Sequence, residues 1–78
     1  MTFDRITIEP GKMSGQPCIR GLRLTVRRVL DIVATYKTRE AWARDFPDLE
    51  EEDAVQALRF AAAALDESVE WEDLVAAR

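Results

Sequence analysis

The chain is organised around the stretch Ser14-Gly-Gln-Pro-Cys-Ile-Arg-Gly-Leu-Arg-Leu-Thr-Val26. It holds two of the three glycines, one of the three prolines and the only cysteine. So many chain-bending residues argue against a helix. Apolar and polar residues interleave from Ile19 to Leu24, which is typical of a short, irregular β element. We therefore predict a segment that presents Arg20 and Arg23 on one surface and starts a helix at Thr25.

A second extended piece is predicted upstream of this stretch. Residues 6–8 read Ile-Thr-Ile and are followed by Pro10-Gly11, so a short strand is expected at about residues 4–9. Residues 17–19 are expected to form another extended piece, and residues 22–24 are a candidate for one more. A two-stranded ribbon of such pieces is weak in water and has open edges. We therefore expect two copies of the chain to pair there, through Ile6, Ile8 and Ile19.

Two helices are predicted directly downstream. Thr25 is a suitable N-cap for a helix over residues 26–36, in which apolar residues recur at helical spacing. Thr38 is the N-cap candidate of a short helix over residues 39–45, and Pro47 ends it because the residue before a proline is pushed out of the helical region. The residues expected to face inward are Val26, Val29, Leu30, Ile32, Val33, Tyr36, Ala41 and Trp42.

A third and longer helix is predicted over residues 51–65. It follows a turn in which Leu49 is expected to fill the corner between helices, and its acidic start suits the helix dipole. Alanine is dense in it, and its length is about 22 Å. The core stripe predicted for this helix consists of Ala54, Val55, Leu58, Ala61, Ala62 and Leu65.

Charge divides the chain into two halves. Residues 1–44 carry nine Lys or Arg against four Asp or Glu, a net charge of +5, whereas residues 45–78 carry two against eleven, a net charge of −9. A basic half indicates a polyanionic partner. An acidic half indicates either a basic protein partner or a solvated surface.

Length and composition exclude several classes of protein. A chain of 78 residues forms one domain whose core is close to the marginal size, which favours a dimer or a partner. The sequence has no histidine, which excludes catalysis by His and His-based metal sites, and Cys18 has no second cysteine to pair with, which suits a reducing cytosol and a small core residue. No apolar run approaches the roughly 20 residues of a membrane span. We expect a cytoplasmic protein that is not an enzyme and needs no cofactor or metal.

The last two predicted helices have the spacing of a helix-turn-helix. Residues 49–59 would then enter a DNA major groove, with Gln56 and Arg59 as the conventional base readers. A generic helical hairpin accounts for the same pattern. The acidic run from Glu50 to Asp53 would repel phosphates, which disfavours ordinary groove insertion of this helix.

Basic residues of the first half are the stronger nucleic-acid candidates. Arg20 and Arg23 could enter a groove, and Thr38 with Arg39 could hold a phosphate at a helix start. A solvated basic face with salt bridges to the acidic half is the alternative. The complete set of predicted DNA-binding residues is Arg20, Arg23, Arg27, Arg28, Thr38, Arg39, Gln56 and Arg59.

Residues 67–78 form an acidic tail. An aromatic anchor surrounded by acids suits a basic groove on another protein, although Trp71 could instead fold back onto the domain core. The predicted partner-binding residues are Val69, Trp71, Leu74 and Val75. The chain would thus divide into a domain over residues 1–66, whose ribbon covers about residues 1–24, and the tail.

The order of these motifs resembles domain-of-unknown-function family 433, a family of small bacterial proteins. Its usual form is a Gly-Lys-Pro-Val-Ile-Arg-Gly-Thr-Arg-Ile stretch followed by a Tyr-Pro-x-Leu turn. Here the matching segments are Ser14–Val26, Phe46-Pro-Asp-Leu49 and Glu52-Asp-Ala-Val-Gln-Ala-Leu58, so the resemblance covers about residues 4–65. The departures are Gln16 for Lys, Cys18 for Val, Leu22 for Thr, and Glu50 where a Ser or Thr cap is common. Losing a lysine and gaining a glutamate weakens the basic character expected of a DNA-binding protein.

The resemblance implies a fold and a function. The fold would be mainly α, with a short N-terminal β ribbon, a three-helix, winged or homeodomain-like helix-turn-helix bundle and the acidic tail. The function would be that of a VapB-like antitoxin, which inhibits a PIN-like ribonuclease toxin and regulates its own operon as a DNA-binding homodimer. A transcriptional regulator or protein-interaction module without a toxin is the alternative.

Overall fold

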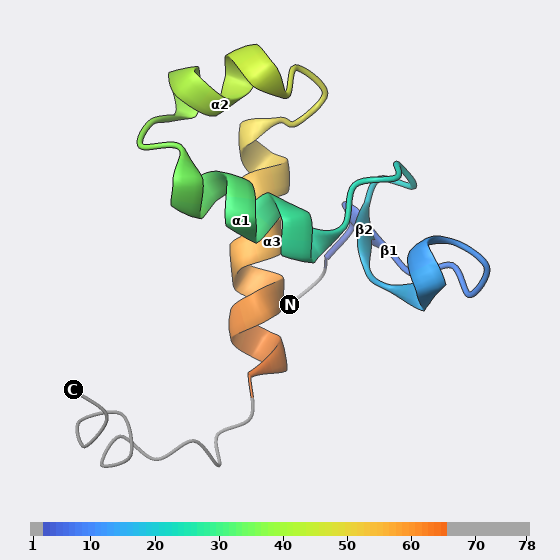
Figure 1. Ribbon diagram of the computed structural model, residues 1–78. Helices are drawn as coiled ribbons and strands as arrows, with labels where there is room; N and C mark the ends of the chain where they lie inside the picture. The colour runs from blue at the N-terminus through green and yellow to red at the C-terminus, as the bar shows by residue number, and fades with distance from the viewer. Residues whose placement is uncertain (1–2, 66–78) are drawn as a thin grey trace, which may run out of the picture.

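The computed structural model describes residues 3–65, which form a small antiparallel ribbon followed by three helices (Figure 1). The ribbon pairs β1 (Ile6–Thr7) with β2 (Cys18–Ile19), in the register Ile6 to Ile19 and Thr7 to Cys18. A single 3-10 turn, η1 (Met13–Gly15), lies between the strands. The helices are α1 (Val26–Thr35), α2 (Arg39–Asp45) and α3 (Glu51–Ala64). The prediction of a mainly helical chain with an N-terminal ribbon is confirmed.

The stretch Ser14–Val26 turns sharply after β2. Arg20 and Gly21 both have positive φ, 46° and 71°, and the Leu22 amide donates to the Ile19 carbonyl at 2.7 Å. The chain then runs back along β2, because the Ile19 amide donates to the Leu24 carbonyl at 2.9 Å and Cys18 forms an isolated bridge with Thr25. β2 is therefore bonded on both sides, and the predicted β element leads directly into α1.

Both predicted N-caps are present. The Thr25 hydroxyl accepts a hydrogen bond from the Arg28 amide at 3.0 Å, and the Thr38 hydroxyl accepts one from the Ala41 amide at 3.1 Å. These bonds satisfy amides that have no partner within the first helical turn. α2 ends at Asp45, before Phe46-Pro47, as predicted from the proline.

The core lies where α1 packs against α3 and α2. Leu49 is buried in the corner between helices, and the thiol-bearing Cys18 is buried in β2, both as expected. Of the residues expected to face inward, Leu30, Val33 and Tyr36 are half-buried and pack against the core cluster. The buried apolar residues of the core cluster are Ile19, Val26, Val29, Ile32, Trp42, Leu49, Ala54 and Ala57.

The predicted inward face of α3 is wrong over its second half. Asp53, Ala54 and Ala57 are buried, whereas Leu58 is 48% exposed and Leu65 is 71% exposed. The reason is geometric: α3 is longer than the part that α1 crosses, so its second half extends beyond the other helices (Figure 1). An apolar stripe at helical spacing is covered only where another element reaches it.

Candidate functional site

A cluster of two arginines and one carboxylate joins the ribbon to the start of α3. The Asp53 side chain is 0% exposed and accepts hydrogen bonds from Arg20 Nη2 at 2.9 Å, Arg20 Nε at 3.1 Å and Arg5 Nη1 at 3.0 Å. It also accepts from the backbone amide of Glu50 at 2.9 Å. Both oxygens of this buried carboxylate thus accept hydrogen bonds, as a buried charge requires.

Arg20 is held in an unusual backbone conformation by the same contacts. A φ of 46° is unfavourable for a residue with a Cβ, so this position needs compensating interactions. Its guanidinium bonds Asp53 in a side-on pair and also donates to the Asp48 carbonyl at 2.6 Å. Arg20, predicted as a DNA contact, therefore has its guanidinium engaged within the molecule.

The contacts perturb the titration of Asp53. Burial alone would raise the pKa of this carboxyl, but hydrogen bonds from Arg20, the Glu50 amide and Arg5 outweigh it and hold the pKa below its ordinary value. Hydrogen bonding to Glu50 and Asp53 raises the pKa of Arg5, and hydrogen bonding to Asp53 raises that of Arg20. All three groups are charged at neutral pH.

This shift predicts acid sensitivity. The unfolded chain binds a proton at a higher pH than folded Asp53 does, so the stabilisation is complete above the unfolded pKa and is lost as the pH falls through the folded pKa. We expect the urea concentration at the midpoint of unfolding to decrease as the pH is lowered below about 4. The Asp53→Asn variant, which has no carboxyl to titrate at this position, should show a flatter profile between about pH 5 and pH 2. Parallel profiles for the two proteins would contradict this assignment.

Arginines of the same chain partly neutralise the negative charge of the first turn of α3. Arg5 Nη1 lies 2.6 Å from Glu50 Oε1, and Arg39 Nε lies 3.3 Å from Glu51 Oε2. With the Asp53 pairs, three of the four acidic residues from Glu50 to Asp53 contact an arginine. The repulsion between this helix start and phosphates is therefore weaker than the sequence indicates.

Gln56 is also engaged within the molecule. Its Oε1 accepts from the Arg5 amide at 3.0 Å, and its Nε2 donates to Asp4 Oδ1 at 2.6 Å. The amide thus bonds the N-terminal segment to α3. Of the two base readers predicted on this helix, Arg59 has an exposed side chain and Gln56 has both ends of its amide bonded.

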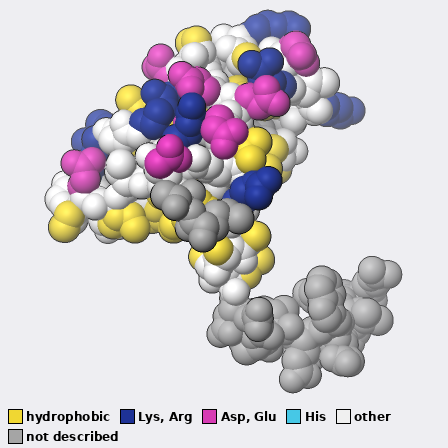
Figure 2. All heavy atoms as spheres, turned by 180° about the vertical axis from the view of Figure 1, so that it is seen from behind, with side chains coloured by type: hydrophobic (Ala, Val, Ile, Leu, Met, Phe, Trp, Pro, Cys, Tyr) yellow, Lys and Arg dark blue, Asp and Glu magenta, His cyan; other side chains and the backbone are white. Residues whose placement is uncertain are grey.

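The other predicted DNA-binding residues lie on the surface. Arg23, Arg27 and Arg28 are exposed around the start of α1, and the Arg28 guanidinium lies over the Phe46 ring at 5.6 Å. Thr38 caps α2, next to Arg39. Seen from behind the view of Figure 1, basic and acidic side chains interleave over much of the surface and do not form one basic face (Figure 2).

The three predicted dimerisation residues differ in exposure. Ile8 is 60% exposed, Ile6 is half-buried and Ile19 is 0% exposed within the core. Only Ile8 therefore offers most of its side chain to a second copy. The predicted partner-binding residues Val69, Trp71, Leu74 and Val75 lie outside the described residues.

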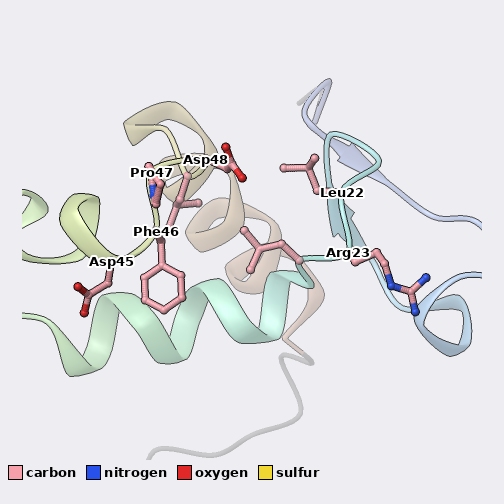
Figure 3. Close-up of a pocket in the computed structure, with 8 residues that line it drawn as sticks. Leu22, Arg23, Asp45, Phe46, Pro47 and Asp48 are labelled. Carbon is pink, nitrogen blue, oxygen red and sulfur yellow. The ribbon is translucent and has the colours of Figure 1, made fainter.

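A pocket of about 310 Å³ separates two segments that are distant in the sequence. Leu22, Arg23 and Leu24 line one side, and residues 45–49 line the other. The Asp48 carboxylate points toward Leu22, the Phe46 ring lies against α1, and the Arg23 guanidinium points away (Figure 3). The hollow is therefore mainly apolar, with one carboxylate facing it.

Residues 6–61 match a family model described as a protein of unknown function, DUF433. The chain belongs to the DUF433 family. The match spans β1 through most of α3, so it includes the ribbon, the Arg20 turn and Asp53, whereas Arg5 lies one residue before it. Neither the curated proteins nor the solved structures include a match to this chain.

The described part of this DUF433 protein contains neither a candidate metal site nor a candidate membrane-spanning helix. Across residues 3–65, no three Asp, Glu or Cys side chains gather in a way that could hold a metal ion. None of the helices in this range combines the length and apolar character that a membrane span needs.

Sequence reasoning missed the partner of Arg20 and the role of Arg5. Asp53 is the third residue after Glu50, the position from which a side chain accepts from the cap amide in a capping box, and this spacing was the available signal for Asp53. The arginine contacts join residues separated by 33 and 48 positions, which no local pattern reveals.

Proposed function

We propose that this DUF433 protein is the antitoxin of a type II toxin–antitoxin pair. It binds and inhibits a PIN-like ribonuclease toxin, and it represses its own operon as a dimeric DNA-binding protein with a homeodomain-like helix-turn-helix. The folded residues 3–65 are the DNA-binding unit in this proposal. The acidic residues 67–78 are the toxin-binding segment.

The charge pairing at the start of α3 carries the DNA-binding part of the proposal. A recognition helix with four free acids at its N-terminus would be repelled by phosphates, but Glu50, Glu51 and Asp53 each contact an arginine. The short α2, the turn over residues 46–50 and the longer α3 also have the helix-turn-helix order. Exposed Arg23, Arg27 and Arg28 would then supply phosphate contacts beside α3.

The distribution of charge supports two separate binding functions. Residues 3–65 carry ten Lys or Arg and ten Asp or Glu, so their formal net charge is zero. Residues 66–78 carry five acids and one arginine, and therefore hold the whole net charge of −4. A neutral folded unit can approach DNA through local arginines, and an acidic extension suits the basic active-site groove of a ribonuclease.

Fluorescence anisotropy with labelled DNA from upstream of the protein's own gene tests the proposal. We expect binding at low salt that is at least about tenfold tighter than to a scrambled duplex of equal length, with affinity falling steeply as salt rises. Absence of binding in about 50 mM salt would remove the DNA-binding part of the proposal.

The toxin-binding part has its own test. Co-expression with a small ribonuclease-like reading frame from the neighbouring gene should give a stable complex. The full-length Trp71→Ala/Leu74→Ala variant should lose that complex and keep its DNA affinity. A variant that retains the complex would move toxin binding away from residues 67–78.

A protein-interaction module without DNA contact is the second candidate. It is favoured by the internal bonding of Arg20 and Gln56, which leaves fewer side chains for reading bases. The apolar pocket between Leu22–Leu24 and residues 45–49 is a second point in its favour. The anisotropy experiment separates the two candidates directly.

A further inference from the structure

The pocket between residues 22–24 and residues 45–49 is small and mainly apolar. Its volume of about 310 Å³ lies at the lower end of the range for ligand pockets. Two of its lining residues, Leu24 and Phe46, are half-buried against the core, and a third, Leu49, is buried. This lining favours an occupant with an apolar body.

Hydrogen bonds within the chain hold the two walls of the pocket together. Arg20, which precedes the first wall, donates from Nη2 to the Asp48 carbonyl on the second wall at 2.6 Å. Within the second wall, the Leu49 amide donates to the Phe46 carbonyl at 3.0 Å. The pocket is therefore preformed, which lowers the cost of ordering it when a partner binds.

The Asp48 side chain places a negative charge at this pocket. Its carboxylate points toward Leu22 across the hollow, whereas the Arg23 guanidinium points away (Figure 3). Among residues 3–65, the Asp48 carboxylate has neither a hydrogen-bond donor nor an ion-pair partner. Arg20, which bonds the Asp48 carbonyl, has its own charge matched by buried Asp53. The described chain thus leaves the Asp48 charge unneutralised.

Two further charged groups near the pocket are engaged within the molecule. Asp45 Oδ2 accepts a hydrogen bond from the Tyr36 hydroxyl at 2.5 Å. The Arg28 guanidinium lies over the Phe46 ring, 5.6 Å from its centroid. Asp48 is therefore the charge in the lining that an incoming group can neutralise.

An apolar hollow with a carboxylate facing it fits a side chain that has an aliphatic stem and a cationic head. Arginine and lysine both bury their stems along apolar surface. Arginine fits better, because its planar guanidinium bonds a carboxylate through two parallel hydrogen bonds and is more weakly hydrated. The same carboxylate disfavours nucleic-acid phosphates, and also residues 66–78 of the chain, which carry five acids and one arginine.

We propose that the pocket between residues 22–24 and residues 45–49 binds an arginine, flanked by apolar residues, of a protein partner. The arginine stem lies along the apolar lining and its guanidinium bonds the Asp48 carboxylate. This contact lies on the folded unit, apart from the toxin-binding segment proposed above. It depends on neither DNA binding nor toxin binding, and the probes that test it contain neither.

Titration of the isotope-labelled, full-length protein with the capped peptide acetyl-Leu-Arg-Leu-amide, followed by amide NMR, tests this contact. We expect shifts concentrated at residues 22–24 and 45–49, with a dissociation constant on the order of 1 mM. The peptide with Gln in place of Arg should bind about threefold more weakly, and the peptide with Glu more weakly still. Equal affinity for the three peptides, or shifts that lie elsewhere, would overturn the proposal.

Variants of the pocket separate its charge from its apolar lining. Asp48→Asn should weaken the arginine peptide about threefold and leave the glutamine peptide unchanged. Leu22→Gln should weaken both peptides by at least about threefold, because it removes apolar contact. Asp31→Asn, which removes an exposed carboxylate from α1, is the matched control and should change neither affinity. An equal effect of Asp31→Asn and Asp48→Asn would contradict an arginine site at Asp48.

The same spectra without peptide test two other occupants. If the chain's own arginine fills the pocket, Arg78→Gln will shift the amides of residues 22–24 and 45–49. If a second copy fills it, these amides will move as the protein concentration rises. We expect neither change, and either one would overturn the assignment to a separate protein partner.

Discussion

Replacing Asp53 by alanine is expected to lower the free energy of unfolding by about 3 kcal/mol, the largest effect of any single substitution considered. The carboxylate is fully buried and bonds Arg20, Arg5 and the Glu50 amide. Removing it leaves two cations next to each other and a helix-start amide without its acceptor. Because a small domain has only about 5–15 kcal/mol of stability, this loss is roughly a fifth to three fifths of the total. Urea denaturation followed by circular dichroism measures the change.

Two controls separate the cluster from a general effect of charge. Glu52→Ala removes an exposed carboxylate one residue earlier and should shift the free energy of unfolding by less than about 0.5 kcal/mol. The double variant Arg20→Ala/Asp53→Ala should cost less than the sum of its single variants, because the two side chains bond each other. Strict additivity, or equal effects of the Asp53 and Glu52 substitutions, would mean that the cluster does not join the ribbon to α3.

Arg27→Glu is expected to weaken binding to the proposed operator DNA by about tenfold and to lower the magnitude of the log–log salt slope by about 1. Arg27 is exposed in the first turn of α1. A glutamate at a helix start interacts favourably with the helix dipole, so this substitution should slightly raise the thermal midpoint. A loss of DNA affinity in this variant therefore could not be attributed to unfolding.

Arg44→Glu is the matched control for this charge reversal. It makes the same change of net charge at another exposed helical arginine, in the last turn of α2. We expect its effect on DNA affinity to be smaller than that of Arg27→Glu. Equal losses would indicate a non-specific response to net charge, and an unchanged Arg27→Glu would exclude the start of α1 from the DNA surface.

Local features of the sequence were sufficient to predict the elements and their ends. The bounds of α2 agree with the prediction, and those of α1 and α3 differ by one residue at their C-terminal ends. Caps and breakers act within three or four residues, so Thr25, Thr38 and Pro47 could be interpreted without knowledge of the fold. The strands were predicted too long, because only the residues that find a ladder partner remain paired.

The candidate site depended on contacts that no local pattern contains. Arg20 and Arg23 look alike in the sequence, one on each side of a Gly-Leu step, yet Arg20 bonds Asp53 and Asp48 whereas Arg23 is exposed. The acidic run from Glu50 to Asp53 looked like a solvated helix start, but its charges are paired with arginines from the ribbon and from α2. Long-range partners of this kind are selected by folding of the whole chain.

The sequence by itself thus determined the order, type and ends of the elements in this DUF433 protein, because helix caps, prolines and apolar periodicity act over a few neighbouring residues. Only the tertiary structure decided which charges are neutralised and which apolar faces are covered. The periodicity of α3 marks Leu58 and Leu65 as apolar, but burial requires a second surface, and α1 covers only the first half of that helix.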